Sequence, residues 1–165
     1  MEDFEKMSSV DDIEQFLYAN IPLSKAIGLK IKQATSDSVE LYAPLEPNMN
    51  DKRTAFSGSI ASTLFLSGWV LTRLLVQAGG MNLSDYDVVI ANSDINFQAP
   101  ITGDFRAVTK PGMQKDAAAT FQQRLSTTGK SKLEIQGTAF SEDRTCCLFT
   151  GVYVAFRKPM PSQKL

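Results

Sequence analysis

Histidine is absent from the 165-residue sequence. Its absence excludes Ser-His-Asp and Cys-His mechanisms and any metal site that histidine ligates. The two cysteines, Cys146 and Cys147, are adjacent, so no Cys-x-x-Cys pair is present and we expect no metal site. The P-loop and the Gly-x-Gly-x-x-Gly fingerprint are missing too. Any chemistry must therefore use carboxylates, amides, hydroxyls or backbone groups, and we expect no cofactor.

The sequence also lacks a strong net charge of either sign, since its 17 Lys and Arg residues are balanced by 18 Asp and Glu residues. Binding of nucleic acid needs a basic field, so we expect no nucleic-acid partner. The start, MEDFEKMSSV, has neither the basic region nor the apolar run of a signal peptide. A bond between Cys146 and Cys147 would be strained, because neighbouring strand residues point to opposite faces. Both are typical of small apolar residues in a reducing compartment, and we expect a cytoplasmic protein.

The chain does contain enough apolar material for one buried core, because 43% of its residues are hydrophobic. No internal repeat or linker divides it. We expect a single domain over residues 1–165, with its core at about 20–157, an N-terminal helix at 10–20 and a loose tail at 158–165.

Periodicity and turn residues predict most of the elements. The helix at 10–20 has Asp11 or Asp12 as its cap. Alternation predicts a hairpin over 29–45 around a turn at 35–38. Further strands are predicted at 105–110, 131–141 and 145–157, with a helix at 116–127 that Gly129 stops.

The longest apolar segment, Gly58 to Ala78, predicts a helix with Ser57 as its N-cap and Gly79-Gly80 as its stop. At about 1.5 Å per residue this helix is about 30 Å long. Polar residues interrupt it before any apolar run approaches about 18 residues, so we expect no membrane span. It is predicted to lie buried against a sheet, where Gly68 allows close approach. A buried helix and consecutive antiparallel strands make an α+β fold.

The clearest strand covers 87–98. Alternation divides its side chains between two faces, and a one-residue error in register would exchange them. We expect the helix-facing set to be Val89, Ala91, Ser93, Ile95 and Phe97. Ser93 is then an inward polar residue.

Three stretches carry a resemblance to a known family. IPLSKAIGLKI resembles the entry segment of hotdog thioesterases, in which a proline-containing helix leads into the first strand. NDKRTAFSGSIASTLFLSGW and INFQAPITGD resemble the loop, central helix, third strand and Pro-x-x-Gly-Asp turn of the YiiD-type putative thioesterase family. The resemblance covers roughly residues 20–157. It implies the hotdog fold, an α+β fold whose antiparallel sheet wraps a long central helix.

The resemblance also implies an assembly and a substrate class. Hotdog thioesterases form dimers whose sheets join edge to edge, with a site for acyl thioesters between the subunits. We therefore expect a homodimer or homotetramer. The acyl carrier implied is coenzyme A or the phosphopantetheine arm of acyl carrier protein.

In related hotdog thioesterases the start of the central helix holds the thioester carbonyl and a carboxylate activates water. Here the matching backbone N–H groups are those of Gly58 and Ser59, which suit a developing oxyanion. Asp51 or Asn50, in the loop before the helix, would orient water. The alternatives are an ordinary helix start and ordinary turn residues. Candidate substrate-binding residues are Asn48, Phe56, Thr63 and Ser93.

The chain departs from the pattern of many hotdog thioesterases. Those enzymes carry His-Gly-Gly at the helix start and an acid about two turns further on. Here the matching stretch is Phe56-Ser57-Gly58, the acid position falls near Phe65, and no acid lies between Ser57 and Ala78. Three hypotheses follow: an acyl-thioester hydrolase, a non-catalytic module that binds acyl thioesters, and a scaffolding relative of a domain normally fused to an acetyltransferase.

Overall fold

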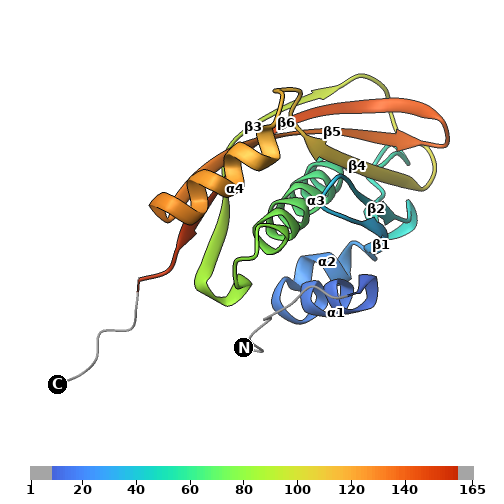
Figure 1. The fold of residues 1–165 in the computed structure, drawn as a ribbon. Helices are drawn as coiled ribbons and strands as arrows, with labels where there is room; N and C mark the ends of the chain where they lie inside the picture. Colours follow the sequence, from blue (N-terminus) through green and yellow to red (C-terminus); the bar gives the residue numbers. More distant parts are fainter. Residues whose placement is uncertain (1–8, 160–165) are drawn as a thin grey trace.

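The computed structural model describes residues 9–159, in which a six-stranded antiparallel sheet curves around one long helix, α3 (Figure 1). The strands lie in the order β1-β2-β4-β5-β6-β3. The strands are β1 Lys30–Ala34, β2 Val39–Ala43, β3 Tyr86–Phe97, β4 Phe105–Pro111, β5 Lys130–Ser141 and β6 Arg144–Arg157. The helices are α1 Val10–Asn20, α2 Pro22–Ala26, α3 Ser57–Ala78 and α4 Ala117–Thr128, with short 3-10 turns at Glu46–Asn48 and Leu83–Asp85. The predicted α+β arrangement is confirmed.

The central helix α3 forms the core of the molecule. Leu64 and Leu71 are fully buried, in agreement with the prediction that this helix lies buried against a sheet. By length and composition α3 is the one helix of residues 9–159 able to cross a membrane, but 67% of its most apolar 18-residue window is buried inside the protein. Hydrogen bonds also fix it to the sheet, because Ser67 shares one with Thr109 at 2.7 Å and Trp69 donates one to the Val88 carbonyl at 3.0 Å.

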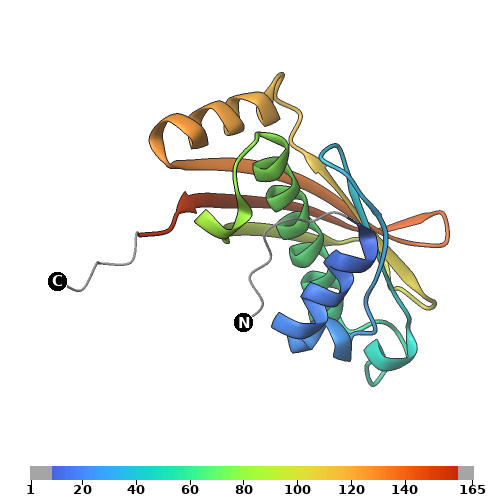
Figure 2. The same ribbon diagram turned by 60° about the horizontal axis from the view of Figure 1, so that its bottom comes forward.

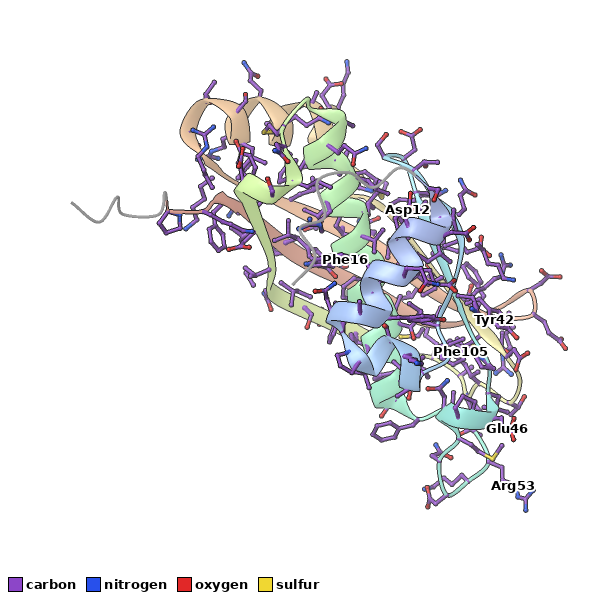
Figure 3. The ribbon with its side chains drawn as sticks, turned by 90° about the horizontal axis from the view of Figure 1, so that it is seen from below. Asp12, Phe16, Tyr42, Glu46, Arg53 and Phe105 are labelled. Carbon is purple, nitrogen blue, oxygen red and sulfur yellow. The ribbon has the colours of Figure 1, made fainter. Side chains whose placement is uncertain are left out.

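The remaining helices cover two different parts of α3. α1 and α2 lie on its side away from the sheet, where the Phe16 ring of α1 stacks on Trp69 (Figures 1 and 3). α4 lies at the C-terminal end of α3, where Gln122 donates to the Leu75 carbonyl at 2.9 Å (Figure 2). These helices do not cover the opposite end of α3, its N-terminus, where the preceding loop lies.

The register of β3 corrects the sequence-based expectation. Ile90 pairs with Tyr153 and Asn92 with Val152, so Ala91 is an extra residue in a β-bulge. Cross-strand partners share a face, and Tyr153 points inward. The helix-facing residues are consequently Tyr86, Val88 and Ile90 before the bulge and Ser93, Ile95 and Phe97 after it. The predictions for Val89 and Ala91 were wrong, because the bulge reverses the alternation.

Edge position explains a second correction. β3 is the last strand of the sheet, and Ser93 is exposed although it lies on the helix-facing side.

At the ends of the chain, the cap of α1 is Ser9, whose hydroxyl accepts from the Asp12 amide, rather than Asp11 or Asp12. Lys158, the first residue of the expected tail, donates its amide to the Asp85 carbonyl at 2.8 Å. Residues 160–165 of the expected tail lie outside the described part.

Candidate functional site

A cavity of about 490 Å³ lies at the N-terminus of α3. One wall is the loop before α3, which Glu46 and Arg53 mark in Figure 3, and the other is the end of β3 with the turn after it. The lining residues are Asn50, Asp51, Lys52, Ala55, Phe56, Ser57, Ile60, Phe97, Gln98, Ala99, Pro100 and Ile101. The cavity therefore combines a polar rim with an apolar wall.

The side chain of Asn50 stabilises the loop before α3 through hydrogen bonds. Its Oδ1 accepts hydrogen bonds from the amides of Lys52 at 2.9 Å and Thr54 at 3.1 Å. Its Nδ2 donates to the Thr54 hydroxyl at 2.9 Å. This turn holds Arg53 at a φ of 61°, a conformation that few non-glycine residues adopt. The side-chain amide of Asn50 thus lines the cavity, but both its oxygen and its nitrogen already form hydrogen bonds within the turn.

Asp51 is the carboxylate among the lining residues. Its side chain is 79% exposed and forms an ion pair with the Lys52 ammonium at 2.9 Å. Such an exposed pair contributes little to stability, so the side chain is free to reorient. Asp51 can accept a proton from a water molecule at the rim of the cavity, but no buried partner fixes its position.

The first turn of α3 presents two unused backbone donors. Phe56 is the N-cap, and Ser57 is the first helical residue rather than the predicted cap. The Ser59 amide donates to the Phe56 carbonyl at 3.0 Å, so it is not free to bind a ligand. Within residues 9–159 the amides of Ser57 and Gly58 have no acceptor. These two amides, at the positive end of the helix dipole, replace the expected pair of Gly58 and Ser59.

The Phe56 ring lies against Gly58. A Cβ atom on Gly58 would be closer than 3.0 Å to this ring, so glycine is required here for the ring to pack over the helix start. The ring is also 54% exposed and lines the cavity. Ser57 lines the cavity as well, whereas Gly58 lies under the ring and does not. Access of a ligand to the Gly58 amide therefore depends on the position of Phe56.

Five of the eight residues expected at the site do not line this cavity: Gly58 and Ser59 of the helix start, and Asn48, Thr63 and Ser93. Asn48 is buried and its amide donates to the carbonyls of Ile27 at 2.8 Å and Pro44 at 2.7 Å, so it holds the loop in place. Thr63 is fully buried and donates to the Ser59 carbonyl at 2.8 Å. Ser93 lies on the exposed edge strand.

The wall formed by Phe97 and the turn after it was missed. The INFQAPITGD stretch was the available signal, but it was interpreted only as a fold motif. The Cys146 carbonyl holds this turn, because it accepts from the amides of Gln98 at 2.9 Å and Ala99 at 3.1 Å. Asp104 ends the turn region, with Oδ1 accepting from the Leu45 amide at 2.9 Å. Hydrogen bonds from Tyr42 and from that amide lower the pKa of Asp104 and favour its charged form.

Thiolate and metal chemistry find little support in the described residues. Cys146 and Cys147 are buried and unbonded to each other. Burial raises the pKa of Cys147 to about 11, so its thiol stays protonated at neutral pH and is a poor nucleophile. No group of three His, Cys, Asp or Glu in residues 9–159 is placed to hold a metal ion. The cavity offers instead backbone N–H groups and one mobile carboxylate.

Comparison with known proteins agrees with this architecture. Residues 10–157 match the model of the family described as "Putative thioesterase (yiiD_Cterm)". A crystal structure titled as a putative thioesterase from Shewanella oneidensis is 25% identical, with a TM-score of 0.74 over 89% of this chain and 96% of that one. A protein of unknown function from Chlorobaculum tepidum is also 25% identical, with a TM-score of 0.81 over 90% and 94%.

A third structure, titled as a probable thioesterase from Pseudomonas aeruginosa, is 13% identical with a TM-score of 0.77 over 93% and 99% of the two chains, and it shows the fold alone. The family model spans almost all of the described residues. The chain therefore belongs to the YiiD C-terminal putative thioesterase family, and its sheet wrapped around α3 is the hotdog fold of that family.

Proposed function

We propose that this protein hydrolyses acyl thioesters carried by coenzyme A or acyl carrier protein. The observation that carries the proposal is the pair of unused amides, Ser57 and Gly58, at the start of α3 beside an open cavity. Two such donors at a helix N-terminus suit the oxyanion that forms when a thioester carbonyl is attacked. The apolar wall around Phe97 and Ile101 suits an acyl chain.

The reaction needs water and a proton acceptor, and Asp51 is placed at the cavity rim for this role. Its carboxylate takes a proton as water attacks the carbonyl carbon. The Ser57 and Gly58 amides hold the resulting oxyanion. Collapse of the tetrahedral intermediate breaks the C–S bond, the Asp51 carboxyl gives its proton to the leaving sulfur, and the carboxylic acid and the thiol leave with Asp51 again a carboxylate. Asn50 supports Asp51 by fixing the turn from which it projects.

The assembly we propose is a homodimer joined through β3, two of which would associate in a homotetramer. β3 is twelve residues long, lies at the sheet edge and exposes Val89 and Ile90. A long edge with exposed apolar side chains is a hazard unless another strand pairs with it. Antiparallel pairing of two β3 edges would bury this strand and place Ser93 at the junction. Two free cysteines accord with the cytoplasm that we propose as the location.

A non-catalytic module that binds acyl thioesters is the second candidate. One observation favours it: α3 carries no carboxylate, and Asp51 is exposed and paired with Lys52 rather than fixed at the cavity. A binding module would use the same amides and the same apolar wall. Turnover, rather than binding, separates the two functions.

The test is a panel of acyl-CoA substrates with detection of the free thiol. We expect turnover by the wild type and a loss of about 100-fold or more in kcat for Asp51→Ala, with binding retained. Glu46→Ala is the matched control, because Glu46 is an exposed carboxylate in the same loop. It should leave kcat unchanged.

Two other outcomes would contradict the proposed hydrolysis or the residues assigned to it. Binding of acyl-CoA with no turnover on any substrate would establish the binding module. Full activity of both Asp51→Ala and Asn50→Ala would remove these residues from the mechanism. Thr63, which is buried, and Ser93, at the proposed junction, would then be the next residues to substitute.

A further inference from the structure

A basic surface lies over α4 and the start of β5, at the end of α3 that is away from the hydrolytic cavity (Figures 1 and 2). Its four cations are Lys115, Arg124, Lys130 and Lys132, which border two adjoining hollows of about 210 Å³ and 510 Å³. None of the four forms an ion pair with an acidic side chain of residues 9–159. We call these four residues the α4–β5 basic surface.

Acidic side chains are scarce on this surface, although the net charge of the protein is −1. The helix α4 contains no Asp or Glu over its 12 residues, a length of about 18 Å. Glu134 is the one acid that lines the hollows, and it lines only the smaller one. Asp116, the N-cap of α4, lines neither. A broad face of the molecule therefore presents positive charge with little to offset it, which attracts an anionic surface.

Met113 projects beside these cations. Its side chain is 88% exposed, more than any other large hydrophobic side chain of residues 9–159. It lies in the turn between β4 and α4, and the Gly112 amide fixes this turn to β5 by donating to the Glu134 carbonyl at 2.8 Å. An apolar side chain held in water next to positive charge is typical of a contact with the apolar layer beneath lipid headgroups.

Ser131 supplies an independent sign that an anion is bound here. It is only 4% exposed, yet it lines both hollows together with Arg124 and Lys132. Its hydroxyl has no hydrogen-bond partner in residues 9–159, which is unusual for a buried polar side chain. The hydroxyl is therefore available to donate to an oxygen atom that enters between the two cations.

We infer that the α4–β5 basic surface docks on a membrane of anionic phospholipids. Its cations meet the headgroup phosphates, Ser131 donates a hydrogen bond to a phosphate oxygen, and Met113 enters the apolar layer. This is a contact at the membrane surface, and α3 remains buried inside the protein. The inference is independent of the proposed hydrolysis. The hydrolytic cavity lies at the other end of α3 and remains open in the docked protein.

A nucleic acid would attract the same cations, but the surface lacks the other part of such a site. Single-stranded nucleic acids stack their bases on exposed aromatic rings. The one aromatic side chain that lines the two hollows is Phe121, which is only 2% exposed. The combination of cations with an exposed methionine therefore favours lipid.

Co-sedimentation with vesicles tests the docking. We expect the wild type to bind vesicles that contain phosphatidylglycerol and not vesicles of phosphatidylcholine alone. Arg124→Gln/Lys132→Gln should weaken this binding about 25-fold, because each cation near an anionic bilayer contributes roughly five-fold. The control Lys25→Gln/Lys32→Gln removes the same charge from exposed sites on α2 and β1 and should bind like the wild type.

Salt separates the two parts of the contact. Sodium chloride screens the cations, so the difference between the wild type and Arg124→Gln/Lys132→Gln should shrink as salt is added. Met113→Ser should weaken binding about five-fold at low salt, and this ratio should persist at higher salt because burial of apolar surface is not screened. Leu23→Ser makes a matched change at an exposed site on α2 and should have no effect.

A fluorescent label reports directly which face meets the lipid. Cys146 and Cys147 are buried, so an environment-sensitive dye reacts selectively with the new thiol of Met113→Cys. Its emission should shift to the blue with phosphatidylglycerol vesicles and not with phosphatidylcholine. The same dye on Leu23→Cys should show no shift, because Leu23 is exposed on α2.

Three results would overturn the inference. The first is equal binding of the wild type to both kinds of vesicle, or equal binding of the wild type and Arg124→Gln/Lys132→Gln to phosphatidylglycerol. The second is displacement of the protein from vesicles by inorganic phosphate or coenzyme A beyond that by sodium chloride of the same ionic strength, which would assign the surface to a soluble phosphate compound. The third is binding of a fluorescent oligonucleotide in preference to the vesicles.

Discussion

Tyr153 of β6 fills the space that a side chain on Gly68 of α3 would need. A Cβ atom on Gly68 would lie closer than 3.0 Å to three atoms of the Tyr153 side chain. The same tyrosine donates a 2.8 Å hydrogen bond to the Phe65 carbonyl, one turn earlier on α3. This contact sets how closely the helix approaches the sheet, and thereby where the start of α3 meets the cavity wall.

Gly68→Ala should therefore destabilise the protein. Alanine favours the helix by about 1 kcal/mol over glycine, but an extra methyl group in a packed core costs about 1–3 kcal/mol, and Tyr153 is too buried to move aside. We expect a net loss of about 1–2 kcal/mol in chemical denaturation. Ser62→Ala, half-buried on the same helix, is the control and should change stability little. An increase in the stability of Gly68→Ala would contradict the packing described here.

Stability should fall at alkaline pH because of Cys147. Burial raises the pKa of its thiol from 9.0 to about 11 in the folded protein. The folded state keeps the proton that the unfolded state loses, so this group contributes its stability below pH 9 and loses it as the pH rises to about 11. Denaturation midpoints measured across this range should decline more steeply for the wild type than for Cys147→Ala. Parallel curves would show that the thiol does not titrate as described.

The proposed dimer predicts a mass of twice 18.1 kDa in sedimentation at micromolar concentration. Val89→Lys/Ile90→Lys should shift the protein to the monomer, because charged side chains block edge-to-edge pairing of strands. Both residues are exposed in the single chain, so the fold should persist by circular dichroism. Leu23→Lys/Met113→Lys makes the same chemical change at exposed sites outside β3 and should leave the mass unchanged. A wild-type protein that sediments as a monomer at this concentration would contradict the proposed dimer.

Most of the elements were predictable because their periodicity is long and their stops are strong. Gly129 at a φ of 73° ends α4 as expected, since this left-handed conformation suits glycine. The face assignment of β3 failed at Ala91, because alternation in a sequence does not reveal an unpaired residue. Such a residue exists only in relation to β6, which lies more than fifty residues further along the chain.

The site was predicted less well than the fold, for a physical reason. Hydrogen bonds decide which helix amides are free, and the Ser59 amide is already engaged with the Phe56 carbonyl.

Gly58 and Phe56 allow the two explanations of the helix start to be separated. Gly58 is required either because substrate must approach the amides or because the Phe56 ring packs over it. In the first case Gly58→Ala raises KM equally with Phe56 or with alanine at position 56. In the second case it raises KM only when the ring is present, because the displaced ring then obstructs the cavity.

The contact favours the second outcome for Gly58→Ala, since the ring lies where the new Cβ atom would be. We expect Gly58→Ala to raise KM for acyl-CoA several-fold in the wild type and to have little effect on Phe56→Ala, which gives a coupling energy of about 1 kcal/mol. Gly58→Val should block binding in both backgrounds, because its larger side chain reaches the position of the substrate carbonyl. The measurement is the four-member cycle of KM values, with circular dichroism to verify folding. Additive effects would show that the ring plays no part in access to the helix amides.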